Sequence, residues 1–215
     1  SVRVASYMNE GMRYRPVSVR EILKEMHDTT TLMVDLAYSS IIFNDKDLAE
    51  EVIELDDKIK ELKTALLMHT AIVIKDPEDA EALSGVLQMG AVSDFISHAA
   101  RNISNIVLLG LGVPPEILSA FARTQERFVR VKISQSSILA GKSVGELSLE
   151  TTIGVKIIAV RRGREVFTNL CDDFILLEGD VLIARGSDVG VIEFDKLARG
   201  ELKSIPEPSL SLEEW

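Results

Sequence analysis

The segment from Leu48 to Leu66 carries an unbroken heptad pattern, which places its apolar residues on one face of an α-helix. The apolar residues recur at alternating steps of four and three, at Leu48, Val52, Leu55, Ile59, Leu62 and Leu66. Charged residues such as Glu54 and Lys58 fill the positions between them. This pattern is typical of a helix that packs along its length against other helices. We therefore expect a helical bundle in the first half of the chain.

Helix start and stop signals predict further helices around this segment. Asp76-Pro77 supplies an N-cap followed by a first-turn proline, and Asn44 interrupts the preceding apolar stripe. The expected helices run from about Pro16 to Phe43, from Asp47 through the heptad segment, from Pro77 to about Leu109, and from Pro115 to about Gln125. Three long helices with short connections predict an up-down bundle. Such a bundle leaves an apolar face for dimerisation, and a closed monomeric bundle is the alternative.

From Phe128 onward the hydrophobic pattern changes from helical to alternating, which indicates strands. Ser143 and Glu146 have the spacing of a capping box before a short helix, and Ser187 can cap a last helix. The run Arg161-Arg162-Gly163-Arg164 reads as a turn between two strands. The order of strand, helix, three strands and helix predicts a small α+β domain with a mainly antiparallel sheet.

Composition excludes several classes of function. The formal net charge of −10 argues against a nucleic-acid partner, because phosphate binding needs clustered Lys and Arg. The only cysteine, Cys171, cannot form an intramolecular disulfide and fits a reducing compartment. The longest apolar run, Ala65 to Ile74, is too short to span a membrane and contains His69. We expect a cytoplasmic protein without direct membrane insertion, and no catalytic motif indicates an enzyme.

Three segments in the second half resemble the TrkA C-terminal domain, also called the RCK C-terminal lobe. They are Ile138 to Leu147, Gly154 to Glu165, and Leu176 to Gly186, and they occur in the order of that family. In the last segment we expect Gly179 to adopt a positive φ and Asp180 to bond back to its own turn.

The resemblance implies a small-ligand site at a dimer interface, and in several cation-transport regulators the ligand is a cyclic dinucleotide. The residues that correspond to that site are Ile157, Ile158, Arg161, Arg162 and Asn169. Arginines can fork onto phosphates, and apolar strand residues can pack against bases. Leu170 follows Asn169 where many members of the family have proline. An ordinary basic turn without a ligand is the alternative interpretation.

The three long helices resemble one repeat of the PhoU family. The evidence is an Asp-rich second helix around Asp56 and a third helix that includes Asp94 and His98. PhoU proteins usually carry two repeats, so a homodimer of this chain would restore that arrangement. PhoU-like domains often bind metal through paired acids on the third helix, which makes Asp94 and His98 candidate ligands, with an internally hydrogen-bonded polar cluster as the alternative.

The expected domains are a PhoU-like bundle over 16–125, a TrkA C-terminal-like ligand-sensing domain over 128–199, and a flexible tail over 200–215. Together these resemblances imply a non-catalytic regulator of a membrane cation transport system, for potassium, with an integral-membrane transporter or channel as its partner. The alternative function is a PhoU-type metal-binding adaptor in phosphate transport signalling. For the first hypothesis the candidate effector is a cyclic dinucleotide or another small molecule, and a metal is not expected; only the alternative function needs one.

Overall fold

The structure is a computed structural model that describes residues 17–121, 126–168 and 170–206. It contains three long helices followed by a small domain built on a four-stranded antiparallel sheet, as the sequence predicts. The helices are α1 (Val19–Phe43), α2 (Lys46–Val73), α3 (Pro77–Leu108), α4 (Pro115–Phe121), α5 (Val144–Leu147), α6 (Leu149–Thr152) and α7 (Asp188–Arg199). The strands are β1 (Arg127–Lys132), β2 (Val155–Arg162), β3 (Glu165–Phe167) and β4 (Val181–Gly186).

The predicted helix ends are confirmed by their backbone and capping contacts. Asn44 adopts a left-handed conformation directly after α1, which asparagine tolerates better than most residues. The side chain of Asp76 accepts the backbone N–H of Asp79 at 2.9 Å and so caps the start of α3. Gly110, with φ of +66°, follows the end of α3. The predicted start at Pro16 and the predicted end at Gln125 lie outside the described residues.

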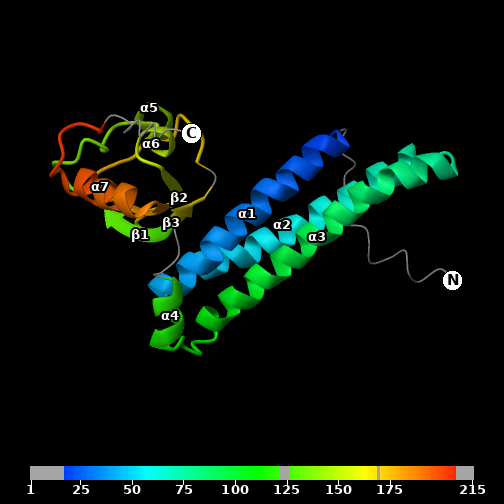
Figure 1. Ribbon diagram of the computed structural model, residues 1–215, viewed down its shortest axis with the longest axis horizontal. Coiled ribbons are helices and arrows are strands. Elements are labelled where there is room, and N and C mark those ends of the chain that lie inside the picture. Colours follow the sequence, from blue (N-terminus) through cyan, green and yellow to red (C-terminus); the bar gives the residue numbers. More distant parts are fainter. Residues whose placement is uncertain (1–16, 122–125, 169, 207–215) are drawn as a thin grey trace, which may run out of the picture. The chain divides into compact units, whose positions relative to one another are not determined.

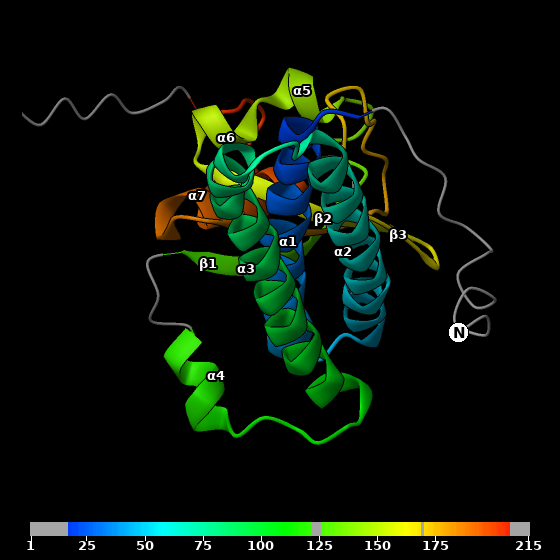
Figure 2. The same ribbon diagram turned by 90° about the vertical axis from the view of Figure 1, so that its right-hand side faces the viewer.

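By contacts, the described residues divide into two compact units, one within 17–31 and 54–99 and the other within 32–53 and 100–206. Within the first unit, segments of α1, α2 and α3 run side by side, as Figure 1 and Figure 2 both show. Met26 and Leu66 are fully buried in this unit, and Gly90 on α3 lies against both. The predicted apolar faces of α1 and α2 therefore form a real core.

The sheet of the second unit has the strand order β1-β4-β2-β3, and every neighbouring pair is antiparallel. Helices α5, α6 and α7 belong to the same small domain (Figure 1). One face of the sheet packs with α7 around Phe194, Leu182 and Val160, all of which are fully buried. The capping box between Ser143 and Glu146 is present at the start of α5. Helix α6 is an element that the sequence analysis did not predict.

Two further expectations concern the end of the chain and the hairpin of β2 and β3. Leu202 and Ile205, which follow α7, pack against the core of the small domain, whereas residues 207–215 of the expected tail lie outside the described residues.

The expectation that Arg161 and Arg162 form a turn is wrong. Both belong to β2 and pair with β3, because the antiparallel register continues until Arg162 faces Glu165.

Candidate functional site

Arg161 and Arg162 are consecutive residues of β2, so their side chains leave the sheet on opposite faces. Val160 and Phe167, which pair across the β2–β3 hairpin, both pack into the core that includes α7. Arg162 points to that side of the sheet, and Arg161 points to the other. The two predicted ligand-binding arginines therefore have different surroundings and different partners.

Arg162 is held in a fixed position by Asp180, at the turn before β4. Its Nε and Nη2 atoms donate to the two carboxylate oxygens of Asp180 at 2.9 and 2.8 Å, and Nη2 also donates to the carbonyl of Ile175 at 2.8 Å. The guanidinium carbon lies 5.7 Å from the ring centre of Phe167 and 5.3 Å from that of Phe174. Hydrogen bonding to Asp180 raises the pKa of Arg162 above its usual range. The guanidinium is thus charged and oriented by its surroundings.

The Gly179-Asp180 turn has the structure that the sequence predicts. Gly179 has φ of +87°, and the carboxylate of Asp180 accepts the backbone N–H of Leu177 at 2.9 Å. The Asp180 side chain is only 1% exposed, so these donors satisfy its buried oxygens. Ile175, whose backbone carbonyl accepts from Arg162, and Leu177, whose backbone N–H donates to Asp180, are 52% and 43% exposed. The result is an exposed apolar surface next to an oriented cation.

Arg161 extends from the opposite face to the connection between α1 and α2. Its Nη2 atom lies 2.5 Å from Asp45 Oδ1 and 3.2 Å from Asp47 Oδ2. The Asp45 side chain is 4% exposed, and Arg130 of β1 approaches its other oxygen at 3.7 Å. Asp45 also accepts the backbone N–H of Leu48 at the start of α2, as an N-cap does. Arg161 is therefore part of a charge cluster around the buried carboxylate of Asp45.

A second charge cluster joins β4 to α1. Arg185 Nε lies 3.2 Å from Asp35 Oδ2, and Arg185 also pairs with Glu126. Burial raises the pKa of Asp35, although the positive charges of Arg185 and Lys156 oppose this shift. The sheet thus meets α1 and α2 through arginines from three strands, each facing an acid on the helices or their connection.

The remaining predicted ligand residues are placed less favourably. Ile157 is half-buried and packs against the core of the small domain, and Ile158 is 2% exposed at an irregularity in the β2–β4 register. Asn169 lies outside the described residues. The structure therefore brings only the end of β2 to a surface, and the ligand role of these residues stays a prediction.

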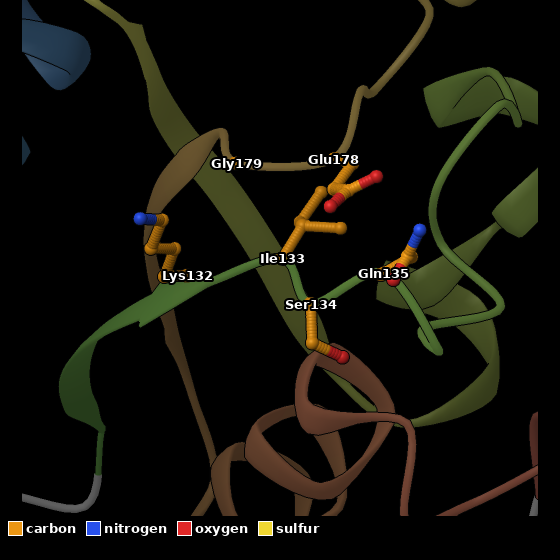
Figure 3. Close-up of a pocket in the computed structure, with 6 residues that line it drawn as sticks. All are labelled: Lys132, Ile133, Ser134, Gln135, Glu178 and Gly179. Atoms are coloured by element: carbon orange, nitrogen blue, oxygen red, sulfur yellow. The ribbon is translucent and has the colours of Figure 1, made fainter.

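A shallow hollow of about 380 Å³ lies elsewhere on the small domain (Figure 3). In this view Lys132 and Gln135 lie on opposite sides of Ile133. The hollow is lined by Lys132, Ile133, Ser134, Gln135, Glu178 and Gly179. It contains none of the residues that the family resemblance indicates, and its lining combines one cation and one anion without an aromatic surface.

Asp94 and His98 lie one turn apart on α3, and the structure brings a lysine to them. Lys63 Nζ is 2.6 Å from Asp94 Oδ2, while His98 Nδ1 lies 2.8 Å from the backbone carbonyl of Asp94 and 3.8 Å from its Oδ1. Across the described part of the chain, no three His, Cys, Asp or Glu side chains are grouped as a metal site requires. Metal binding by Asp94 and His98 stays a prediction.

Sequence reasoning missed the groups that position the two arginines. Asp45 was not assigned to the site, and Asp180 was recognised only as a turn residue. Phe167 and Phe174 were not assigned to the site at all. Strand parity was the available signal, because consecutive arginines in a strand need partners on opposite faces. The partner of each arginine could not be chosen without the register of the sheet.

Family models match both halves of the chain. A PhoU domain model matches residues 23–107, and a TrkA-C domain model matches residues 128–199. The PhoU match includes all of α2 and most of α1 and α3. The TrkA-C match includes most of β1, all of β2, β3 and β4, and helix α7.

Individual proteins are similar over parts of the chain. Over 104 residues the chain is 27% identical to Ktr system potassium uptake protein C from Bacillus subtilis (strain 168), which is 48% of this chain and 46% of that protein. The chain thus spans about half the length of this relative. The RCK C domain of the potassium transport protein KtrA, solved with cyclic diadenosine monophosphate, is 28% identical, with a TM-score of 0.32, and the match covers 38% of this chain and 92% of that one. The GsuK RCK domain is 19% identical with a TM-score of 0.32, and the match covers 54% of this chain and 25% of that one.

Helix length and apolarity bear on membrane association. Within the described ranges, no helix is both long and apolar enough to cross a bilayer.

The two family matches account for the helical and the sheet-containing parts of the chain in turn. The chain is therefore a PhoU domain followed by a TrkA-C domain.

Proposed function

We propose that this chain is a non-catalytic regulator of a membrane cation transport system, for potassium, and that its TrkA-C domain binds a small ligand at the exposed end of β2. The observation that carries the proposal is the opposite placement of Arg161 and Arg162. One arginine lies at a surface that can receive a ligand, and its neighbour is ion-paired to the helices. The matched TrkA-C model and the partial similarity to a potassium uptake protein support the transport setting.

The surface around Arg162 favours a ligand that combines a phosphate with a flat ring. Arg162 Nη1 makes no hydrogen bond among the described residues, so it can donate to a phosphate while Nε and Nη2 remain on Asp180. Ile175 and Leu177 offer apolar area against which a base can pack. A cyclic dinucleotide has this chemistry twice, which suits a site shared by two copies of the domain.

Arg161 supplies a physical route from the ligand to the helices. A ligand that shifts the end of β2 also moves Arg161, because the two arginines share one peptide unit. Asp45 then loses or changes its closest ion pair, at the point where α1 ends and α2 begins. Regulation follows if the ligand binds one arrangement of this cluster more tightly than another. The helical part would carry the change to an integral-membrane transporter or channel.

Isothermal titration of the full chain with cyclic di-AMP tests the ligand site, with cyclic di-GMP and ATP as comparison ligands. The informative variant is Leu177→Glu, which places an acid on the exposed surface beside Arg162. The matched control is Val189→Glu, since Val189 is a 66% exposed apolar residue on α7. We expect Leu177→Glu to weaken binding about tenfold or more and the control to leave it unchanged. Equal affinities for both variants, or no binding of any of these nucleotides, would overturn the proposed site.

A further inference from the structure

Helix α3 carries a second apolar stripe that faces away from the core of its unit. Its positions recur at alternating steps of three and four, at Ala82, Gly85, Met89, Val92, Ile96 and Ala99, and all six are exposed. Met89 and Val92 are 60% and 56% exposed, which is unusual for large apolar side chains in a row. We call these six residues the outer seam. Phe95, which is 76% exposed, lies directly beside it.

The outer seam is separate from the face of α3 that packs inside the unit. Gly90 and Ser97, which lie between seam positions, are buried. A Cβ atom added to Gly90 would lie 2.6 Å from Leu66 Cδ2, and Ser97 donates to the buried carboxylate of Asp56. Internal packing therefore explains the inner face and leaves the outer seam without a role in the folded unit.

Gly85 is the residue that most clearly requires a partner for this seam. A glycine inside a helix is less favourable than alanine by about 1 kcal/mol. Gly85 lies inside α3, and nothing lies within 4 Å of the Cβ atom that another residue would have there. Neither a positive φ nor a close neighbour within the described chain accounts for it. A large side chain from outside, seated over Gly85, would account for it.

The seam itself contains the side chain that fits this notch. When a second α3 lies antiparallel, the six positions pair as Ala82 with Ala99, Gly85 with Ile96, and Met89 with Val92. Small residues meet small ones at the ends, and Ile96 of each copy covers Gly85 of the other. The contact runs about 26 Å along the helix at 1.5 Å per residue.

Charge along the seam is compatible with a second copy of this acidic chain. The chain carries a formal net charge of −10, so two copies repel each other wherever acids face acids. The outer seam contains no charged residue, and its flanking positions include Glu81, Gln88 and Asn102, so the antiparallel register places Glu81 near Asn102 of the other copy. It is thus a stretch on which two equally charged molecules can meet without paired acids.

We propose that the outer seam binds the outer seam of a second copy of this chain, antiparallel, with Ile96 of one copy over Gly85 of the other. This interface is independent of any ligand at β2 and can form whether or not the TrkA-C domain also pairs. The partner is therefore a like chain, and the contact is isologous.

Cysteine cross-linking of the full chain tests the register. In a Cys171→Ser background, which removes the native exposed thiol, Ala82→Cys and Ala99→Cys are made separately. Neither single variant should form a covalent dimer with itself under a mild oxidant, whereas a mixture of the two should form one readily. Adding Val92→Glu to both variants should abolish the product, and Ala91→Glu, one position off the seam with the same charge change, should not.

Each outcome decides the matter, with circular dichroism melts checking that every variant is folded. Self-linking of either single variant would show a parallel register and overturn the proposal. Absence of a covalent dimer in the mixture would do the same, because another partner or no partner would then cover the seam. Titration with nucleotides is unaffected by these results, so this interface and the proposed ligand site can fail separately.

Discussion

Replacing Arg162 by alanine should destabilise the TrkA-C domain strongly, whatever it does to ligand binding. The substitution removes both Arg162 donor atoms, Nε and Nη2, from the carboxylate of Asp180, which is 1% exposed. Within the described part of the chain, the carboxylate then keeps the backbone N–H of Leu177 as its donor. It also removes the cation from the rings of Phe167 and Phe174. Arg162→Ala is therefore a poor probe of the ligand site, although the sequence suggests it as the first choice.

The expected magnitude follows from the burial of Asp180. Removing one partner of a buried ion pair leaves an uncompensated charge and costs about 3 to 5 kcal/mol. The Arg162 side chain is itself 36% exposed, so water can partly replace it, and we expect the lower end, about 3 kcal/mol. That is a large share of the roughly 5 to 15 kcal/mol that stabilises a typical domain.

Urea unfolding followed by circular dichroism measures this loss, and Arg164→Ala is the matched control. Arg164 is exposed in the same hairpin turn, and its removal should change the unfolding free energy by less than about 0.5 kcal/mol. In an Asp180→Asn background, Arg162→Ala should cost clearly less, because the buried carboxylate is already gone. Equal losses in both backgrounds would refute the reasoning.

Three further predictions concern other parts of the chain. Burial raises the pKa of Asp35 above 3.8, so the protonated carboxyl group favours the folded state. This contribution to stability is fully present below pH 3.8 and is lost as the pH rises through the folded-state pKa. Urea unfolding between pH 3 and pH 7 should show the loss in the wild type, and Asp35→Asn should remove it. Gly190→Ala should lower the melting temperature although alanine favours helices, because the new Cβ would lie 2.1 Å from the carbonyl oxygen of Ile153; a melt equal to that of the wild type would contradict the packing described. Zinc should bind weakly in equilibrium dialysis because Lys63 is ion-paired to Asp94, and the Lys63→Ala variant should bind zinc more tightly. Equal zinc binding by the variant and the wild type would show that Asp94 and His98 are not ligands.

Local sequence signals predicted most of the fold because the relevant contacts lie within a few residues of each other. The heptad pattern of α2, the Asp76 cap and the Ser143 capping box each depend on neighbours three or four positions away. The left-handed Gly179 was also predictable, since the turn that it forms is complete within four residues.

The candidate site was predicted less well because it depends on contacts distant in sequence. Arg161 and Asp45 are 116 positions apart, and Arg162 and Asp180 are 18 apart. A run of basic residues around a glycine is typical of a turn, and only the β2–β3 register shows that both arginines are in the strand. Ile158 was assigned to a ligand by family resemblance; it lies at a register irregularity and is 2% exposed, and its ligand role stays a prediction.

The same limit applies to the outer seam of α3. Its apolar positions are visible in the sequence, but they overlap with those of the inner face. Burial of Gly90 and exposure of Met89, one residue away, separate the two faces only once the bundle is known. Gly85 and Gly90 are both helix glycines, and of the two only Gly90 has a close packing partner among the residues that the structure describes.

The central claim is that a ligand at the end of β2 is felt at the α1–α2 connection through Arg161. Hydrogen exchange of the full chain, with and without saturating cyclic di-AMP, measures this directly. The account predicts altered exchange both in residues 155–168 and in residues 40–50, with the second change lost in Arg161→Ala while the first remains. Changes confined to residues 155–168 in the wild type, or identical changes in the variant, would contradict it.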